Sequence, residues 1–461
     1  MQKKNPKDPA IFRGHTRRRT ISASYRAQSP SLSEPFRHKL PNGITVVGES
    51  VPTVESVAVG VWVNFGSRDE KRDENGLTHL IEHMVFKGTR SFSAEEIVGT
   101  IEGRGGYINA FTTKESSCYY AKVFREEVEQ TLSVLSELVL YPTFKEPDLR
   151  NERKVVLSEM QEVYDDPEDW GMDYIEEKIF GANSLSMSII GKSSTLRSFS
   201  AHDLAIFHKR NFTADRIVVA AAGNFSESGL LDLVSKYFSP MPKSTRVYIR
   251  TKPHQDKPHD YIVRRDAGKQ VHILLGAPAP GLNDKERFAA SMVGVILGDG
   301  SSSRLYKDVR EKSALAYSVY SYGSGYADTG VIGIYACTGL RDYQRAEDQI
   351  YQTIGDFVKT GPTTEEVVRA KAQLKAGIIF SLENLWDRAS IFARDELYYK
   401  ERSNIAESLD TIEKVTSGEI MDAAANYLTR DKVTSLKILP VNRETRSVVR
   451  SRSKAKRRSR N

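Results

Sequence analysis

The sequence has few cysteines and no long apolar run. Only Cys118 and Cys337 occur in 461 residues, and they lie far apart in the chain. A disulfide framework needs several pairs, so this composition excludes a disulfide-stapled secreted domain and is typical of a reducing compartment. No apolar run approaches the ~18–20 residues of a membrane helix. We therefore expect no membrane span, and the length predicts two large domains.

The two ends of the chain lack the apolar pattern of a folded domain. Residues 1–35 are rich in Arg, Lys, Ser and Pro with a net charge of +6, and residues 446–461 carry +8 with no acid. Both segments are predicted to be disordered tails. Because the whole chain carries +7, the body between them carries −7 and is acidic. The high pI of 9.0 therefore comes from the tails.

The N-terminal tail also bears on location. It has no apolar h-region, which excludes a secretory signal. Its Arg and Ser content suits a mitochondrial presequence, but Asp8, Pro6 and Pro9 oppose an amphipathic helix. We predict a cytoplasmic, bacterial-like location, with the mitochondrial matrix as the alternative. The basic tails could bind nucleic acid without specificity; no motif supports such a partner, and none is expected.

One five-residue stretch, His79-Leu80-Ile81-Glu82-His83, carries the chemistry. Apolar residues recur at helical spacing from Gly76 to Lys87, so the stretch is predicted to be helical. His79, Glu82 and His83 then share one face, where two imidazoles can bind a common Zn²⁺. The intervening carboxylate can take a proton from a water that the metal activates. Ordinary surface histidines can also have this spacing, so the motif alone does not decide.

A second stretch supports the metal interpretation. Glu152 and Glu159 are seven residues apart in a predicted helix, Pro147 to Val163, and lie on one face of it. Zinc with two histidine ligands needs one more protein ligand, and a helical Glu is the usual third. The remaining histidines form no ligand-like spacing: His15, His38, His202, His208, His254, His259 and His272.

The combined motif resembles that of the pitrilysin/insulinase family of zinc metallopeptidases. It is most similar to the mitochondrial-processing-peptidase-like branch, over about Phe36 to Pro440. The resemblance implies one Zn²⁺ per chain, with His79, His83 and Glu159 as ligands and Glu82 as general base. Glu152 becomes a catalytic acid that supports the site from outside the ligand set.

The predicted elements repeat along the chain. The first half is predicted to contain strands at Phe36–Leu40, Ile44–Gly48, Ser56–Phe65, Tyr107–Phe111, Ser116–Val123 and Ile217–Ala222, with helices at Ser93–Ile101 and Glu126–Leu140. The second is predicted to contain strands at Lys269–Ala277, Ser318–Tyr322 and Gly330–Thr338, with helices at Lys285–Leu297, Ser303–Glu311, Tyr343–Lys359 and Thr364–Leu382. We expect an α+β fold of two homologous α/β-sandwich repeats, each a mostly antiparallel sheet packed with helices and together half of a clamshell. The predicted domains are 36–250, which binds zinc, and 251–445.

The second half carries no His-x-x-Glu-His but has another family-like motif. Arg310 and Tyr317, seven residues apart, resemble the Arg and Tyr that contact substrate and oxyanion near the zinc in this family. A guanidinium and a phenol suit a developing oxyanion, although both could be ordinary surface residues. The chain has Ala314 where the family usually has Gly, so the local turn is expected to differ slightly.

The substrate is expected to bind along a strand edge. Asn109-Ala110-Phe111 resembles the edge strand on which these enzymes bind a peptide by β-augmentation, although Asn109 could equally be a turn residue. We predict a zinc endopeptidase that acts on peptides or unfolded, presequence-like segments, as a homodimer with its active site completed in trans. The alternatives are a non-catalytic core or scaffold subunit, a heteromeric partner of a processing peptidase, or a nucleic-acid-associated protein.

Overall fold

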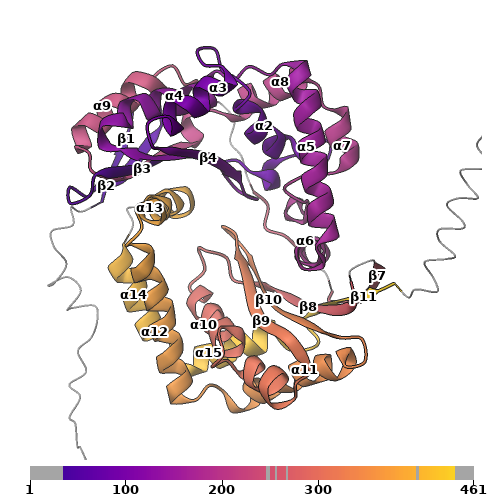
Figure 1. Ribbon diagram of the computed structural model, residues 1–461. Coiled ribbons are helices and arrows are strands. Elements are labelled where there is room, and N and C mark those ends of the chain that lie inside the picture. Colours follow the sequence, from indigo (N-terminus) through magenta and orange to yellow (C-terminus); the bar gives the residue numbers. More distant parts are fainter. Residues whose placement is uncertain (1–34, 245–249, 255–256, 266–267, 401–403, 442–461) are drawn as a thin grey trace, which may run out of the picture.

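The chain forms two β-sheets, each with helices packed on its outer face. The computed structural model describes residues 35–244, 250–254, 257–265, 268–400 and 404–441. The first sheet and its helices lie above the second in Figure 1. The predicted tails lie outside the described residues except for residue 35, and the boundaries at 250 and 251 stay a prediction.

The first sheet has six strands in the order β1-β2-β6-β3-β5-β4. Their bounds are β1 Phe36–Lys39, β2 Thr45–Ser50, β3 Ser56–Val63, β4 Tyr107–Thr112, β5 Ser117–Phe124 and β6 Ile217–Gly223. β2 and β6 are parallel, and the other neighbours are antiparallel. The central strands β3 and β6 are buried on both faces, which their almost unbroken Val and Ala content allows. β4 is left as an edge strand.

The second sheet repeats this order. It runs β7-β11-β8-β10-β9, with bounds β7 Asp260–Arg265, β8 Gln270–Ala279, β9 Ala316–Gly325, β10 Gly330–Gly339 and β11 Thr434–Pro440. Its first two strands are parallel and the rest antiparallel, as in β2-β6-β3-β5-β4 of the first sheet. The matching order and directions confirm the predicted duplication, to which the first half adds β1.

The described α-helices number eight in the first half and six in the second. In the first half they are α2 Leu77–Val85, α3 Ala94–Glu102, α4 Val128–Leu140, α5 Glu146–Asp165, α6 Pro167–Phe180, α7 Ser193–Ser198, α8 Ala201–Asn211 and α9 Glu227–Phe238. In the second they are α10 Arg287–Gly298, α11 Tyr343–Thr360, α12 Thr364–Ser381, α13 Leu385–Tyr399, α14 Ile405–Lys414 and α15 Ser417–Tyr427. The sequence prediction omitted α6 to α9, α13 to α15, β7 and β11. None of the described helices is both long and apolar enough to cross a bilayer.

The helix predicted at Ser303–Glu311 is present, and most of it is not an α-helix. The segment Tyr306–Lys312 is a π-helix, whose hydrogen bonds run one residue further than in an α-helix. Side-chain spacing along so short a segment does not separate the two helix types, so the pattern of buried Leu305 and Val309 indicated only a helix.

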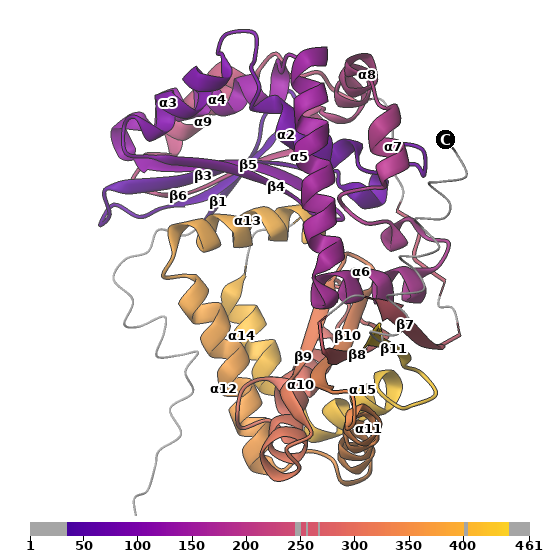
Figure 2. The ribbon, with the colours of Figure 1, turned by 45° about the vertical axis from the view of Figure 1, so that its right-hand side comes forward.

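One helix from each half packs on the sheet of the other half. α13 contacts β2, β3 and β6 of the first sheet and lies directly beneath it (Figures 1 and 2). In return α6 contacts β8 and β11 of the second sheet. Apolar side chains of α6, including Ile175 and Ile179, form one buried cluster with Leu274 and Ile438. We call this arrangement the helix exchange.

Charged side chains also join the halves beside the helix exchange. Arg68 Nη1 donates to Glu115 Oε1 at 2.6 Å, and its guanidinium forms two bonds of 2.8 and 2.7 Å with Asp328 in the turn between β9 and β10. The Ala327 amide donates to the other oxygen of Glu115 at 2.9 Å. Arg68 and Glu115 are buried, so removal of one partner would leave an uncompensated buried charge. The hairpin of the second half is thereby fixed against the segment that precedes α2.

Candidate metal centre

The N-terminus of α2 is held by a buried carboxylate. Glu70 accepts hydrogen bonds from the backbone amides of Gly76 at 2.8 Å and Thr78 at 2.7 Å, and from Asn75 Nδ2 at 3.1 Å. Gly76 has φ +98, and a Cβ there would lie 2.9 Å from the carbonyl oxygen of Ile190, so only glycine fits. Burial raises the pKa of Glu70 to about 7, although these donors oppose the rise. This role of Glu70 was not predicted, because the residue lies in irregular backbone, outside any helical pattern.

The two faces of α2 are chemically different. Leu77, Leu80, Ile81 and Met84 are buried in the core of the first half. The motif residues occupy the other face, which is turned toward α5. Burial of one apolar face therefore fixes the direction in which His79, Glu82 and His83 point.

α5 brings its acidic residues to that face. Leu149, Glu152, Val156 and Glu159 recur at helical spacing; Leu149 and Val156 enter the same core as α2. Arg153, on another side of α5, donates to the carbonyl oxygens of Leu196 at 2.9 Å and Phe199 at 2.6 Å. The helix is thus held in place on two sides, and its two glutamates face the histidines.

The structure brings the three predicted ligands together. Nε2 of His79 lies 3.6 Å from Glu159 Oε1, and Nε2 of His83 lies 3.5 Å from Glu159 Oε2. One ligand atom from each residue falls within a cluster 4.8 Å across. A tetrahedral zinc ion with ligands at about 2.0–2.1 Å separates its ligand atoms by about 3.4 Å. The donor types and their spacing therefore fit a zinc ion.

Glu82 lies next to this cluster but is not part of it. Its Oε2 atom is buried and has no hydrogen-bond partner among the described residues. Burial raises the pKa of Glu82, and the charge of Glu159 adds to the rise, whereas Thr112 and His83 lower it. A carboxylate that is desolvated and unpartnered at one oxygen is suited to accept a proton.

Glu152 contacts a ligand instead of joining the cluster. Its Oε2 lies 3.3 Å from His83 Nδ1, the ring nitrogen opposite the one that faces Glu159. Its Oε1 pairs with Lys87 Nζ at 2.7 Å. A carboxylate at the outer nitrogen fixes the tautomer and orientation of a ligating histidine. Lys87 was not among the predicted site residues; it lies in the turn just after α2, four residues after His83, and that spacing was the available signal.

The two histidines differ in their electrostatic surroundings. Burial lowers the pKa of His79 to about 4, so its imidazole is neutral near pH 7, the form that ligates metals. Burial would also lower the pKa of His83, but Glu159, Glu82 and Glu152 outweigh it and raise that pKa. The opposite pKa shifts of the two histidines therefore arise in one pocket that is both buried and acidic.

The predicted substrate strand is β4, and it lies at the sheet edge as expected. Its outer edge therefore has backbone groups that no other strand of the sheet pairs. Asn109 does not lie in a turn; its Nδ2 donates to Tyr107 Oη at 2.5 Å and its Oδ1 accepts from the Ala110 amide at 2.8 Å. Contact of Asn109, Ala110 and Phe111 with substrate stays a prediction.

Arg310 and Tyr317 are not brought to the cluster within this chain. They lie together, with the Arg310 guanidinium 5.5 Å from the centre of the Tyr317 ring, and Tyr317 is 73% exposed. Tyr317 is at the start of β9, whereas the other end of this ten-residue strand meets the first half. Ten extended residues span about 30 Å, so Tyr317 lies about that far from the end of β9 that meets the first half. Ala314 has φ +49, the backbone that favours glycine, so the residue is strained where the family usually has Gly.

Family models match both halves of the chain. The model described as "Insulinase (Peptidase family M16)" matches residues 45–193, which include the cluster. The model described as "Peptidase M16 inactive domain" matches residues 198–374. The chain belongs to the M16 peptidase family. The resemblance to the insulinase group is thus confirmed.

Relatives of this M16 chain match over most of its length. An uncharacterized zinc protease of Bacillus subtilis is 35% identical over 87% of the chain and 97% of its own length. One of Mycobacterium tuberculosis is 37% identical over 86% and 91%. The β subunit of the mitochondrial-processing peptidase of Blastocladiella emersonii is 30% identical over 88% and 89%.

Solved structures share the fold of this M16 chain. A protease from Helicobacter pylori superposes with a TM-score of 0.81 at 22% identity, over 88% of this chain and all of its own. A peptidase M16 inactive domain from Pseudomonas fluorescens gives 0.82 at 20% identity, over 88% and 98%. The predicted fold of two homologous repeats is confirmed.

Proposed function

We propose that the protein is a zinc-dependent endopeptidase with one Zn²⁺ per chain. The convergence of His79, His83 and Glu159 with Glu82 beside them carries this proposal. When bound, zinc would act as a Lewis acid and lower the pKa of the attacking water to near neutral pH. The zinc-protease names of the bacterial relatives support the same activity.

The protein residues have separate tasks in this proposal. Glu82 Oε2 accepts the proton of the attacking water and passes it to the leaving amine. Glu152 holds His83 through Nδ1, and Lys87 holds Glu152. The free edge of β4 binds the peptide backbone in extended form.

Metal content and cleavage measured together test the activity. Wild-type protein is expected to hold about one zinc per chain and to cleave a peptide library, and a chelator should abolish cleavage. Glu82→Gln should keep the metal and lose about 10²–10⁴-fold in rate. Equal rates for the two proteins would overturn the assignment of Glu82. A non-catalytic scaffold subunit, the alternative, would cleave nothing and would not need Glu82.

We further propose that a second chain, most simply a copy of this one, completes the site. Tyr317 is exposed and lies far from the cluster within one chain, as expected of residues that act in trans. A mixture of Glu82→Gln chains with Arg310→Ala/Tyr317→Phe chains should recover part of the wild-type activity. If the motifs act in cis, mixing restores nothing. The β-subunit name of one relative makes a related but different chain the other candidate partner.

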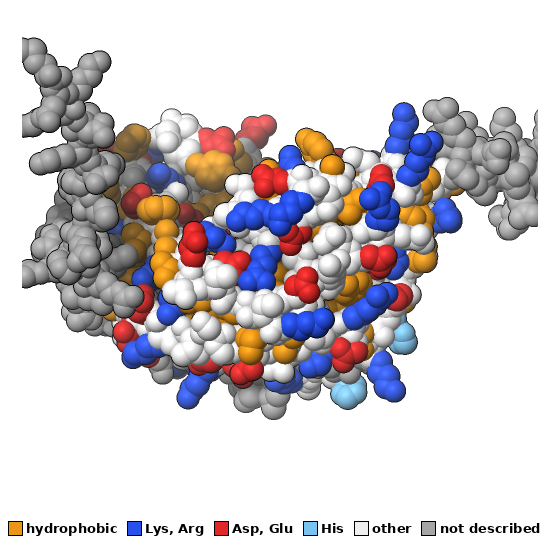
Figure 3. Space-filling view, turned by 90° about the horizontal axis from the view of Figure 1, so that it is seen from below, with side chains coloured by type: hydrophobic (Ala, Val, Ile, Leu, Met, Phe, Trp, Pro, Cys, Tyr) orange, Lys and Arg blue, Asp and Glu red, His pale blue; other side chains and the backbone are white. Residues whose placement is uncertain are grey.

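The substrates are proposed to be basic, extended peptides or unfolded, presequence-like segments. The acidic body would attract them, and added salt should weaken the preference because screening shortens to ~8 Å near 0.15 M. Lys and Arg are interspersed with Asp and Glu over the described residues of the face in Figure 3, so that face has no continuous basic patch for nucleic acid. The cytoplasmic location, with the mitochondrial matrix as the alternative, stays a prediction.

A further inference from the structure

Four aromatic side chains form a continuous cluster on the inner face of the first sheet. We call Trp62, Phe111, Tyr120 and Trp386 the aromatic platform. Trp386 stacks on Trp62 with ring centres 5.2 Å apart and on Tyr120 with centres 3.9 Å apart. Phe111 meets Trp386 edge-on at 6.4 Å. Trp386 comes from α13, so the second half supplies one ring of a cluster that is otherwise built on the first sheet.

The strand register explains how these rings meet. Trp62, Cys118 and Phe111 are directly paired across β3, β5 and β4, and Gly60, Tyr120 and Asn109 form the next row on the same face. A Cβ on Gly60 would lie 2.5 Å from the Trp62 ring and 3.2 Å from the Trp386 ring, so any larger residue would displace the stacked pair. The bare Gly60 backbone thus leaves room for a ring from the other half.

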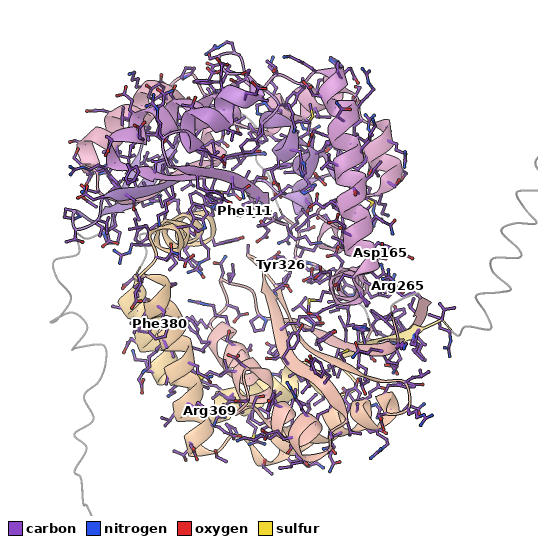
Figure 4. All side chains as sticks on the ribbon, viewed as in Figure 1. Phe111, Asp165, Arg265, Tyr326, Arg369 and Phe380 are labelled. Atoms are coloured by element: carbon purple, nitrogen blue, oxygen red, sulfur yellow. The ribbon has the colours of Figure 1, made fainter. Side chains whose placement is uncertain are left out.

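The aromatic platform reaches the free edge of the sheet. Phe111 belongs to the edge strand β4, and Tyr107, two rows away on the same face, is 48% exposed. A cavity of about 890 Å³ opens beside Phe111 and Trp62, with Tyr326, Asp387 and Ile391 in its wall. Figure 4 shows Phe111 at the boundary between the halves, across from the hairpin that carries Tyr326. A side chain entering from the β4 edge would therefore find both apolar rings and space.

A peptide paired with β4 would present its side chains alternately to the two faces of the sheet. One set would face α2 and the metal cluster, on the side of Thr112, whose proximity lowers the pKa of Glu82. The other set would face the aromatic platform. On the basis of the proposed peptidase function, we propose that the platform is a specificity subsite that selects a large apolar or aromatic side chain. The selected residue is the one that lies opposite Phe111 on the inner face.

The subsite predicts a measurable preference at one peptide position. Peptides with Phe or Ala at each position near the cleaved bond are compared by kcat/KM. The wild type should prefer Phe at one inner-facing position by about 10–100-fold. Phe111→Ala and Trp386→Leu should lose most of that preference while still cleaving. If both variants keep the wild-type preference, the subsite is overturned while the peptidase function stands.

A pure packing role for these rings would give a different result. If the rings only pack, Phe111→Ala and Trp386→Leu would change the thermal unfolding temperature and leave the preference for Phe over Ala in the peptide unchanged. Phe124→Ala is the matched control, because Phe124 ends the neighbouring strand β5, is 49% exposed and lies outside the platform. It should keep the full preference. If Trp386→Leu does not fold, Phe111→Ala, at the edge of the cluster, decides alone.

A binding measurement separates the subsite from catalysis. The chain has three tryptophans; Trp62 and Trp386 lie in the aromatic platform, and Trp170 lies on α6. Glu82→Gln protein should show a fluorescence change with the Phe peptide, a weaker affinity for the Ala peptide, and no such difference after Phe111→Ala. If the wild type cleaves nothing but this selectivity is found, the peptidase proposal fails and the subsite stands. Equal affinities for both peptides in Glu82→Gln protein would overturn the subsite.

Discussion

The two halves of the chain share one order of five strands, and the most telling difference between them lies in one pair of helices. In the first half α2 packs on α5; in the second α10 packs on α12. α2 turns His79, Glu82 and His83 toward α5, whereas α10 contains no His, Cys, Asp or Glu, and its Met292, Val293 and Ile296 are buried. The sheet tolerates either pair. The proposed metal chemistry therefore depends on one helix pair, and the shared fold alone does not provide it.

The largest expected effect comes from removal of the third ligand. Glu159→Gln should lower zinc affinity by more than the ~100-fold typical of residues that act through a ligand. Bound zinc is measured by elemental analysis after dialysis. The matched change in the second half, Glu365→Gln on the exposed side of α12, should retain all of the zinc. Equal zinc contents in the two variants would contradict the assignment of the zinc site to the first half.

A smaller effect is expected from the residue that holds His83. Glu152→Gln should lose about 10–100-fold in activity with less zinc loss than Glu159→Gln, because Glu152 acts through His83 Nδ1. Glu162→Gln, an exposed glutamate on the same helix, is the control and should behave as wild type. Greater zinc loss in Glu152→Gln than in Glu159→Gln would reverse the two roles.

The buried cap of α2 should make stability depend on pH. Burial raises the pKa of Glu70 to about 7, so between pH 4.5 and 7 the folded state holds a proton that the unfolded state releases. Relative to Glu70→Gln, the wild-type free energy of unfolding should therefore fall by about 3 kcal/mol as pH rises through this window. Denaturant unfolding at several pH values measures it.

Glu96 provides the opposite case for this test. It is exposed, and its hydrogen bonds to Ser93 lower its pKa, so its contribution is lost only as pH falls below the ordinary carboxyl range. Glu96→Gln should leave the slope between pH 4.5 and 7 unchanged. A wild-type slope equal to that of Glu70→Gln would show that Glu70 is not held as described.

The smallest expected effect is in the second half. Ala314→Gly should raise the free energy of unfolding by about 1 kcal/mol, because the φ of +49 strains any residue with a Cβ. Ala425→Gly, the same change inside helix α15, should lower it by about 0.5–1 kcal/mol. Denaturant unfolding of both variants measures the two changes in free energy of unfolding, which should be opposite in sign. Destabilisation by Ala314→Gly would show that the backbone at position 314 is not strained by the Cβ of alanine.

Local patterns allowed much of the centre to be predicted. The motif residues of α2 and the pair Glu152 and Glu159 lie at fixed helical spacings, so their shared faces follow from the sequence alone. The duplicated strands were likewise visible as short apolar runs. Helices with weak apolar faces, such as α6, were missed because few of their apolar residues repeat at helical spacing.

Contacts between distant parts of the chain could not be predicted in this way. Trp386 stacks on Trp62 only because α13 crosses to the first sheet, and no periodicity in either segment encodes that crossing. Glu70 acts from irregular backbone that only the fold places at the end of α2. The trans role of Arg310 and Tyr317 stays a prediction, because the structure contains one chain.

The helix exchange has a consequence for the origin and handling of this chain. Two single-repeat chains that swapped this helix would form a dimer with the same packing, and a linker between them would give the present chain without any repacking. Conversely, a fragment cut between the halves would expose the apolar surface that α13 covers, around Val218 and Ala220. Such fragments should aggregate when expressed alone and should become soluble when the two are produced together.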